Sequence, residues 1–203
     1  MGLSPTEKET LHHYYTTRAA RFSDPAAQCG WISPFTQTLR FQAVTTGCDL
    51  SSATLLDVGC GYADLFSFLQ QDYENIRYTG LDLLPQFVDA AQTRHPEATC
   101  IAADFFEYTA TPYDYVFAVG AFNHRVQDNR HLLAMALRKM FEIAKVCVGV
   151  SLLSDLSPAE LKRAKSLFYY SPAEVFQMAT AITPFVELKT HYLPNDMTIV
   201  LYK

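Results

Sequence analysis

The chain has 203 residues, of which 49% are hydrophobic and 18% are charged, which excludes a disordered polymer and supplies enough apolar material for a folded core. The 16 Lys and Arg against 21 Asp and Glu give a formal net charge of -5, which argues against a uniformly basic surface for nucleic acid. Five cysteines without C-x-x-C spacing suggest no disulfide framework and favour a reducing, cytoplasmic location. No apolar run reaches the roughly 18 residues of a membrane helix.

Residues 1–50 contain no strand-like run and predict a helical cap. The residue pattern predicts helices over 10–21 and 35–44, the first broken by Ser23-Asp24-Pro25 and the second ended by Gly47. From residue 54 onward, short apolar runs alternate with amphipathic segments. The predicted strands are 54–58, 77–81, 98–103, 113–119 and 145–152, and the predicted helices between them are 64–71, 86–94 and 129–144. This alternation is typical of right-handed crossovers and a doubly wound α/β sheet.

The last third of the chain predicts two more helices and a pair of strands. The tetrapeptide Ser-Pro-Ala-Glu occurs at residues 157–160 and 171–174, and each copy has the residues of a helix N-cap and first turn. Residues 185–192 and 197–202 predict antiparallel strands joined by Leu193-Pro194-Asn195-Asp196. We therefore expect one domain over residues 1–203, with a helical cap of residues 1–50 and a core of residues 51–203.

The segment after the first predicted strand carries the clearest functional signal. The strand leads into Gly59-Cys60-Gly61 and directly into a helix. The first glycine permits a tight turn, and the second removes a side chain where a ligand must approach the backbone. Asp82 ends the next predicted strand, where a carboxylate can accept hydrogen bonds from both hydroxyls of a ribose. This pattern predicts a ligand that contains a nucleoside.

The acidic residues around the turn narrow the choice of nucleoside. A dinucleotide fingerprint needs a third glycine, but Asp64 occupies that position, and Asp57 lies just before the turn. Two carboxylates there would repel a pyrophosphate and would suit a ligand with a cationic group. S-adenosylmethionine (SAM) has a ribose, an adenine, an α-ammonium and a sulfonium, and it has no phosphate.

Residues 54–64 resemble motif I of the class I SAM-dependent methyltransferases. Residues 78–82 and 102–105 resemble the second and third motifs of that family, and residues 113–120 resemble its fourth strand. The resemblance implies a Rossmann-like, mostly parallel seven-stranded sheet whose last strand is antiparallel. It also implies a cofactor site that is made of Asp57, Gly59, Gly61, Asp82, Leu83, Ala103, Asp104, Phe105 and Gly120.

The resemblance assigns roles within this site. Asp57 would lie near the amino acid moiety of SAM, and Gly120 near its methionine part. Asp82 would bind the ribose hydroxyls. Asp104, with the backbone of Ala103 and Phe105, would hold adenine, although Asp104 could instead be the N-cap of a helix.

The cap resembles that of small stand-alone bacterial-type methyltransferases of unassigned substrate, which have a Tyr-rich helix, a Gly-Trp pair and a Gln-x-x-Arg-Phe word. Arg40 would pair with the carboxylate of SAM, or would be a surface arginine. The candidate acceptor-binding residues are Tyr14, Tyr15, Trp31, Phe122 and Asn123. The three cap aromatics would form a lid over cofactor and acceptor, or would only pack the cap against the sheet.

Residues 120–124 after the fourth strand read Gly-Ala-Phe-Asn-His and lack the Asn/Asp-Pro-Pro-Tyr sequence of enzymes that methylate amino groups of nucleic-acid bases. A Pro-Cys nucleophile and paired acids for a metal are also missing, so we expect no nucleic acid and no metal. A small-molecule acceptor is favoured, and a protein side chain remains an alternative. His124 is the candidate general base, with a loop histidine of no catalytic role as the alternative.

The predicted function is methyl transfer from SAM to a small-molecule acceptor by in-line displacement. The alternatives are an NAD-linked oxidoreductase on a similar sheet and a non-catalytic SAM-binding scaffold.

Overall fold

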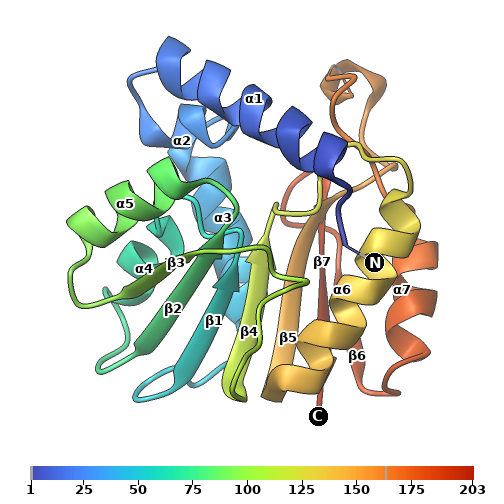
Figure 1. Ribbon diagram of the computed structural model, residues 1–203. Coiled ribbons are helices and arrows are strands. Elements are labelled where there is room, and N and C mark those ends of the chain that lie inside the picture. The colour runs from blue at the N-terminus through green and yellow to red at the C-terminus, as the bar shows by residue number, and fades with distance from the viewer. Residues whose placement is uncertain (1, 163) are drawn as a thin grey trace.

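The computed structural model describes residues 2–162 and 164–203 and contains a seven-stranded sheet (Figure 1). The order of its strands is β3-β2-β1-β4-β5-β7-β6. The strands are β1 (Thr54–Val58), β2 (Arg77–Asp82), β3 (Thr99–Ala102), β4 (Tyr113–Val119), β5 (Ala144–Leu153), β6 (Val186–Lys189) and β7 (Asp196–Tyr202). β7 runs antiparallel to both of its neighbours, and the pairs among β1 to β5 are parallel. The predicted fold class is confirmed.

The strand register brings the carboxyl ends of the central strands to one edge. Asp57 is paired with Gly80, and Asp82 is paired with Ala102, so the residues that follow these strands lie side by side. The chain moves outward from β1 to β3 and then returns to β4 on the other side of β1. The gap between β1 and β4 is therefore the topological switch point, where ligands of doubly wound sheets bind.

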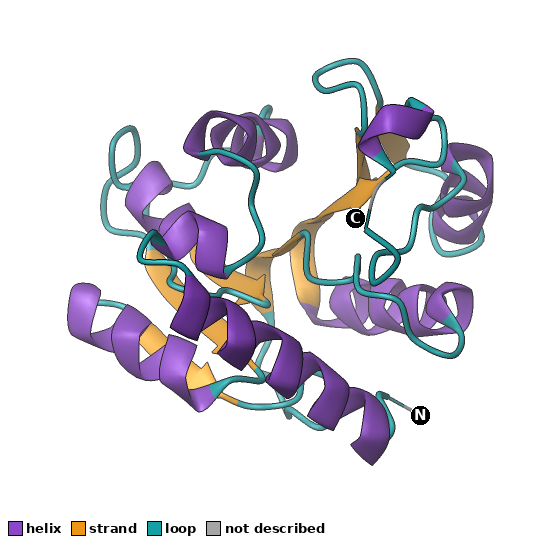
Figure 2. Ribbon diagram, turned by 90° about the horizontal axis from the view of Figure 1, so that it is seen from above, coloured by secondary structure: helices purple, strands orange, loops and turns teal. Residues whose placement is uncertain are grey.

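Helices cover both faces of the sheet, as the view from above shows (Figure 2). One face packs against α3 (Pro34–Thr45), α4 (Asp64–Leu69) and α5 (Pro85–Arg94), in a core that includes Phe41, Leu55 and Phe66. The other face packs against α6 (Asn129–Ile143) and α7 (Pro172–Thr180), in a core that includes Leu133, Val148 and Val175. These helices fix the sheet, so the loops at its carboxyl edge start from a rigid base.

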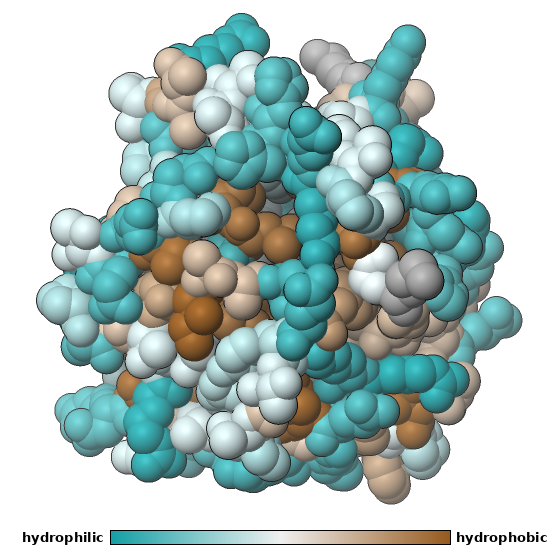
Figure 3. Space-filling view, in the orientation of Figure 1, coloured by the Kyte–Doolittle hydropathy of each residue, from teal (hydrophilic) through white to brown (hydrophobic). Residues whose placement is uncertain are grey.

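The cap consists of α1 (Pro5–Arg21), the short α2 (Pro25–Gln28) and α3. α1 begins five residues earlier than the sequence pattern predicted, because Ser4 and Glu7 form a capping box in which each side chain bonds the backbone of the other residue. α1 crosses the top of the molecule in Figure 1, above the carboxyl ends of the parallel strands. The space-filling view shows hydrophobic residues gathered below this helix, whose own surface is mostly hydrophilic (Figure 3).

Two predictions for the last third of the chain were wrong in part. The first Ser-Pro-Ala-Glu word starts only a 3-10 turn, Ala159–Leu161, because the Ser157 hydroxyl bonds the carbonyl oxygens of Ser154 and Asn195 instead of capping a helix. The second word begins α7 as predicted, although Ser171 makes no capping bond with its side chain. The strand predicted over 185–192 is shorter, since only Val186–Lys189 pairs with β7.

No helix in the described part of the chain combines the length and the apolar character that a membrane crossing requires.

Candidate active site

A cavity of about 630 Å³ lies between the carboxyl edge of the sheet and α1. Its walls come from the loops after β1, β2, β3 and β4, from the cap and from the segment after β5. All of the residues that the sequence proposed for the site contribute to its lining: Tyr14, Tyr15, Trp31, Arg40, Asp57, Gly59, Gly61, Asp82, Leu83, Ala103, Asp104, Phe105, Gly120, Phe122, Asn123 and His124. The fold thus brings together residues from the cap and from four strand ends, and their individual roles stay predictions.

The glycines of the β1–α4 turn sit where side chains would collide. Gly59 has φ +76, and a Cβ atom on it would lie 2.5 Å from the Cβ of Ala121. Gly61 has φ +55, and a Cβ atom on it would lie 2.9 Å from the sulfur of Cys29. Only glycine adopts such backbone angles without strain and leaves this space open. The turn therefore offers bare backbone to a ligand at the switch point.

A third glycine, Gly120, follows β4 and faces the cap. Its φ is +78, and a Cβ atom there would lie 2.9 Å from the indole ring of Trp31. Trp31 is half-buried, and it both lines the cavity and packs the cap against the loop after β4. The guanidinium of Arg40 lies 5.1 Å from the centre of the same ring.

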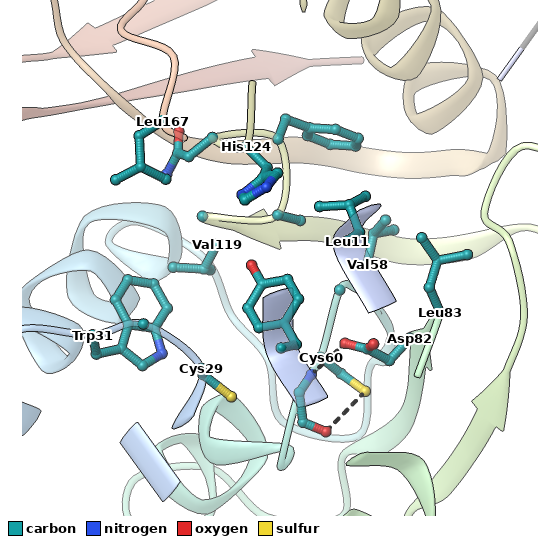
Figure 4. Close-up of a pocket in the computed structure, with 18 of the residues that line it drawn as sticks. Leu11, Cys29, Trp31, Val58, Cys60, Asp82, Leu83, Val119, His124 and Leu167 are labelled. Carbon is teal, nitrogen blue, oxygen red and sulfur yellow. Dashed lines mark hydrogen bonds between the residues drawn. The ribbon is translucent and has the colours of Figure 1, made fainter. Parts of the chain in front are cut away.

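Two buried carboxylates flank the glycine turn. Asp82 is 9% exposed and accepts hydrogen bonds from the backbone N–H groups of Gly61 (2.9 Å) and Leu84 (3.0 Å). Burial raises its pKa, and those hydrogen bonds act in the opposite direction. Asp57 is 3% exposed, and burial raises its pKa to about 7, although the hydroxyl of Tyr78 donates to it at 2.7 Å. Figure 4 shows the Asp82 carboxylate near Cys60, the residue between the two glycines of the turn.

Asp104 carries a partner that the sequence did not reveal. The ammonium of Lys8, on α1, lies 2.6 Å from one carboxylate oxygen of Asp104 and 2.8 Å from Glu107. The other oxygen of Asp104 accepts from the N–H of Phe106 at 2.8 Å. Residues 105–107 form a turn, and there is no helix in the described segment 103–112, so the alternative that Asp104 caps a helix was wrong.

Arg40 is buried, so the alternative of a surface arginine was wrong. Its guanidinium donates to both carboxylate oxygens of Asp196, at 2.8 and 2.6 Å, and to the backbone oxygen of Thr36 at 2.9 Å. Arg40 is 4% exposed and Asp196 is 2% exposed. This ion pair ties α3 to the start of β7, while a role toward a carboxylate of SAM stays a prediction.

His124 lies under the aromatic residues of α1. Its ring centre is 4.6 Å from that of Tyr14 and 6.3 Å from that of Tyr15. His124 is 8% exposed, and its Nδ1 atom has no hydrogen-bond partner in the described structure. Burial lowers its pKa, so the imidazole is neutral at pH 7. The neighbouring Asn123 is structural as well as cavity-lining, because its side-chain oxygen accepts from the N–H of Leu153 at 2.9 Å.

The sequence missed much of the apolar lining. Leu11 of α1, Leu153 at the end of β5 and a group from the segment after β5 line the cavity, and that group is Leu161, Ala164, Leu167 and Tyr169. The spacing of Leu11 with Tyr14 and Tyr15 on one helix face could have indicated Leu11. The group after β5 had no signal, because the pattern there predicted a helix that does not form.

Comparisons with known proteins agree with this geometry. A family model described as a methyltransferase domain matches residues 55–145. The plantazolicin methyltransferase BpumL in complex with SAH is similar in structure, with a TM-score of 0.66, 15% identity and 98% of each chain covered. The DhpI–SAM–HEP complex is also similar in structure, with a TM-score of 0.71 and 16% identity. The match covers 97% of this chain and 98% of that chain.

A third similar structure is the magnesium protoporphyrin IX methyltransferase ChlM from Synechocystis PCC 6803 with bound SAM. Its TM-score is 0.65 at 16% identity, and 96% of each chain is covered. At these identities the structural likeness establishes the fold, and the family model places residues 55–145 in a methyltransferase domain.

Proposed function

We propose that this chain transfers a methyl group from SAM to a small-molecule acceptor within the cavity below α1, since residues 55–145 match a methyltransferase-domain model and the fold is shared with methyltransferases crystallised with SAM or SAH. The observation that carries the proposal is the position of the cavity. It lies at the switch point between β1 and β4, and both the glycine turn and the buried acids line it.

The lining residues fit SAM in charge and in shape. Gly59, Gly61 and Gly120 leave a backbone cradle that a Cβ atom would fill. The acids Asp57, Asp64 and Asp82 line the cavity around the same turn, which suits a ligand that is cationic and free of phosphate. The pyrophosphate of NAD would meet these carboxylates, so the oxidoreductase alternative has no support here.

We assign the cofactor residues as follows. Asp82 receives the ribose hydroxyls, and Leu83 follows it along the cavity wall. Asp104, with Ala103 and Phe105, receives adenine. Asp57 and Gly120 flank the amino acid part. For Arg40 we propose a positioning role, because Asp196 and the Thr36 carbonyl already occupy its guanidinium.

When bound, SAM supplies an electrophilic methyl group on a sulfonium. The chain has to orient the acceptor and exclude water, and positioning of this kind can supply roughly 7–11 kcal/mol of barrier reduction. The cap aromatics Tyr14, Tyr15 and Trp31, with Phe122, close the cavity above the strand ends. His124 is neutral and buried, so it can receive a proton from an acceptor that is protonated at neutral pH. The five free cysteines support a cytoplasmic location for this reaction.

Two measurements test the proposal. Calorimetry compares SAM, S-adenosylhomocysteine (SAH) and NAD. Binding of the two sulfur nucleosides and not of NAD is expected, and NAD binding alone would overturn the proposal. Incubation with methyl-labelled SAM and cell extract then looks for label transfer.

A matched pair of variants controls the label-transfer measurement. Gly59→Arg should abolish transfer, since its space is taken by Ala121. Gly47→Arg should retain transfer, because Gly47 also has a positive φ, +89, but has no atom within 4 Å of an added Cβ. SAH binding without any transfer would favour a SAM-binding scaffold.

A further inference from the structure

The cavity has two unlike halves. One half follows β1, β2 and β3 and contains the acids and glycines that we assign to SAM. The other half, here called the acceptor chamber, is lined by Leu11, Tyr14, Val126, Leu132, Leu167 and Tyr169. Figure 4 shows His124 and Leu167 on one side of the cavity and Asp82 and Cys60 on the other. The chamber is therefore an apolar space that faces the cofactor half.

The cations in the described lining of the cavity, Arg18 and Arg40, are already engaged. The guanidinium of Arg18 donates to the backbone oxygen of Ala27 at 3.0 and 2.5 Å and lies 4.8 Å from the ring centre of Phe22. That of Arg40 is paired with Asp196. A carboxylate or phosphate in the chamber would therefore have to displace one of these contacts to gain a cation.

One polar atom in the chamber has no partner. His124 is 8% exposed, and its Nδ1 makes no hydrogen bond in the described structure. An unsatisfied buried polar atom is destabilising, and a hydrogen bond from a ligand would remove that cost. A hydroxyl group is suitable because it can donate to a neutral imidazole.

The chamber also continues to the surface through apolar residues. Ile32 and Leu161 both line the cavity and are 79% and 41% exposed. These two side chains extend the apolar lining of the cavity to its rim. An acceptor could therefore extend past the chamber without meeting a polar rim at these two positions.

We propose that the acceptor is an uncharged, apolar alcohol or phenol whose hydroxyl binds His124 and whose apolar body passes between Ile32 and Leu161. This proposal rests on the proposed methyl transfer. In that reaction the oxygen–carbon bond forms while the sulfur–carbon bond breaks, sulfur keeps the electron pair of the broken bond, and the hydroxyl proton passes to His124.

Trp31 provides a direct assay, because it is the one tryptophan of the chain and lines the cavity. SAH-loaded protein is titrated with para-heptylphenol, with the same phenol bearing a terminal carboxylate or a terminal ammonium on its chain, and with heptylbenzene. Quenching of Trp31 fluorescence reports binding. We expect the neutral phenol to bind at least tenfold more tightly than each charged analogue and more tightly than heptylbenzene. Equal or tighter binding of a charged analogue, or no binding of the neutral phenol, overturns the proposal.

Two variants sharpen this result. In His124→Phe the phenol and heptylbenzene should bind equally, because the hydrogen-bond partner is gone. Leu161→Lys should raise the affinity for the carboxylate analogue, whereas Val146→Lys, at a site that is 43% exposed and outside the cavity lining, should not. A carboxylate affinity that does not respond to Leu161→Lys contradicts the proposed exit. Calorimetry with SAH on the same samples distinguishes failure of the proposed methyl transfer from failure of the proposed acceptor class. Absence of SAH binding would refute the methyl transfer. SAH binding together with the wrong phenol preference would refute only the acceptor class.

Discussion

The two long helices of the cap, α1 and α3, are attached to the sheet by opposite kinds of contact. α3 buries Arg40, Phe41, Ala43 and Val44, and it packs against β4, β5 and β7. In α1 only Leu11 is buried. The rest of α1 is held by half-buried aromatic contacts, such as Tyr14 with His124, and by polar contacts at its surface, including Lys8 with Asp104 and the backbone N–H of Gln127 with Glu7 at 2.8 Å.

This difference indicates that the cap is not one unit. α3 belongs to the hydrophobic core and should open only when the whole protein unfolds. α1 covers the cavity through exposed contacts, each worth little, so it should open at a lower free energy than the core. Opening of α1 would then expose the cavity while the sheet and the glycine turn keep their shape.

The largest expected effect comes from removing the buried anchor of α3. Arg40→Ala leaves Asp196 buried without its cation, and we expect a loss of about 3–5 kcal/mol in the free energy of unfolding. Chemical denaturation measures it. Arg18→Met, on α1, should cost less than about 1 kcal/mol, because this half-buried side chain makes no buried ion pair.

The double variant Arg40→Met/Asp196→Leu is the control, because it removes both charges and should recover most of the lost stability. Equal losses of unfolding free energy for Arg40→Ala and Arg18→Met would show that α3 and α1 are anchored equally strongly, which would contradict the proposed difference between them.

The second effect concerns the single buried residue of α1. Leu11→Ala should weaken the docking of α1 by about 1–2 kcal/mol, less than a leucine in a closed core, because Leu11 faces a cavity. Hydrogen exchange should quicken in α1 and stay unchanged in α3. Leu50→Ala, at a position with 0% exposure, should instead lower global stability by about 2–5 kcal/mol. Faster exchange in both helices after Leu11→Ala would contradict separate opening.

The sequence predicted the sheet and the position of the glycine turn because their signals are local. Continuous apolar runs gave the buried strands, and Gly59 and Gly61 follow directly from the first of them. Asp57 and Asp82 end adjacent parallel strands, so their proximity follows from the topology. These features depend on few contacts between distant parts of the chain.

The cap and the acceptor chamber were predicted less well because long-range contacts decide them. Nothing near Lys8 in sequence indicates Asp104, and nothing near Arg40 indicates Asp196. Three words of the form Ser-Pro-x-Glu also behave differently. The one at Ser4 forms a full capping box, the one at Ser171 starts a helix without a capping bond, and the hydroxyl of Ser157 is drawn to Asn195 from another part of the chain.

The third effect is a pH dependence that should affect α1 alone. Burial under Tyr14 lowers the pKa of His124 below 6.5, and opening of α1 would return it toward that value. The open state then binds more protons between the two pKa values, so acid favours opening, by up to roughly 1 kcal/mol per pH unit. Hydrogen exchange in α1, corrected for its intrinsic pH dependence, should become faster as the pH falls below 6.5 and should not depend on pH above that value. His124→Gln should remove the dependence, and a pH response of equal size in α3 would contradict the assignment.

The smallest effect tests the polar attachment of α1. Lys8→Met removes the ion pairs with Asp104 and Glu107, and pairs near the surface contribute roughly 0–1 kcal/mol. We expect a value toward the upper end, because the side chain of Asp104 is only 7% exposed and would lose its cation. Exchange in α1 should quicken a few-fold at low salt, while the free energy of global unfolding should hardly change.

High salt provides the sharper form of this test, since screening weakens exposed pairs and should narrow the difference between Lys8→Met and the unaltered protein. Lys145→Met is the matched control, because Lys145 on β5 pairs with Asp114 on β4 at 3.2 Å, so its ion pair does not involve α1. It should leave exchange in α1 unchanged at any salt concentration. If Lys8→Met leaves exchange in α1 as unchanged as Lys145→Met does, then α1 is held by packing around Leu11 rather than by charge. The opening of the cavity would then have to be assigned to the segment after β5.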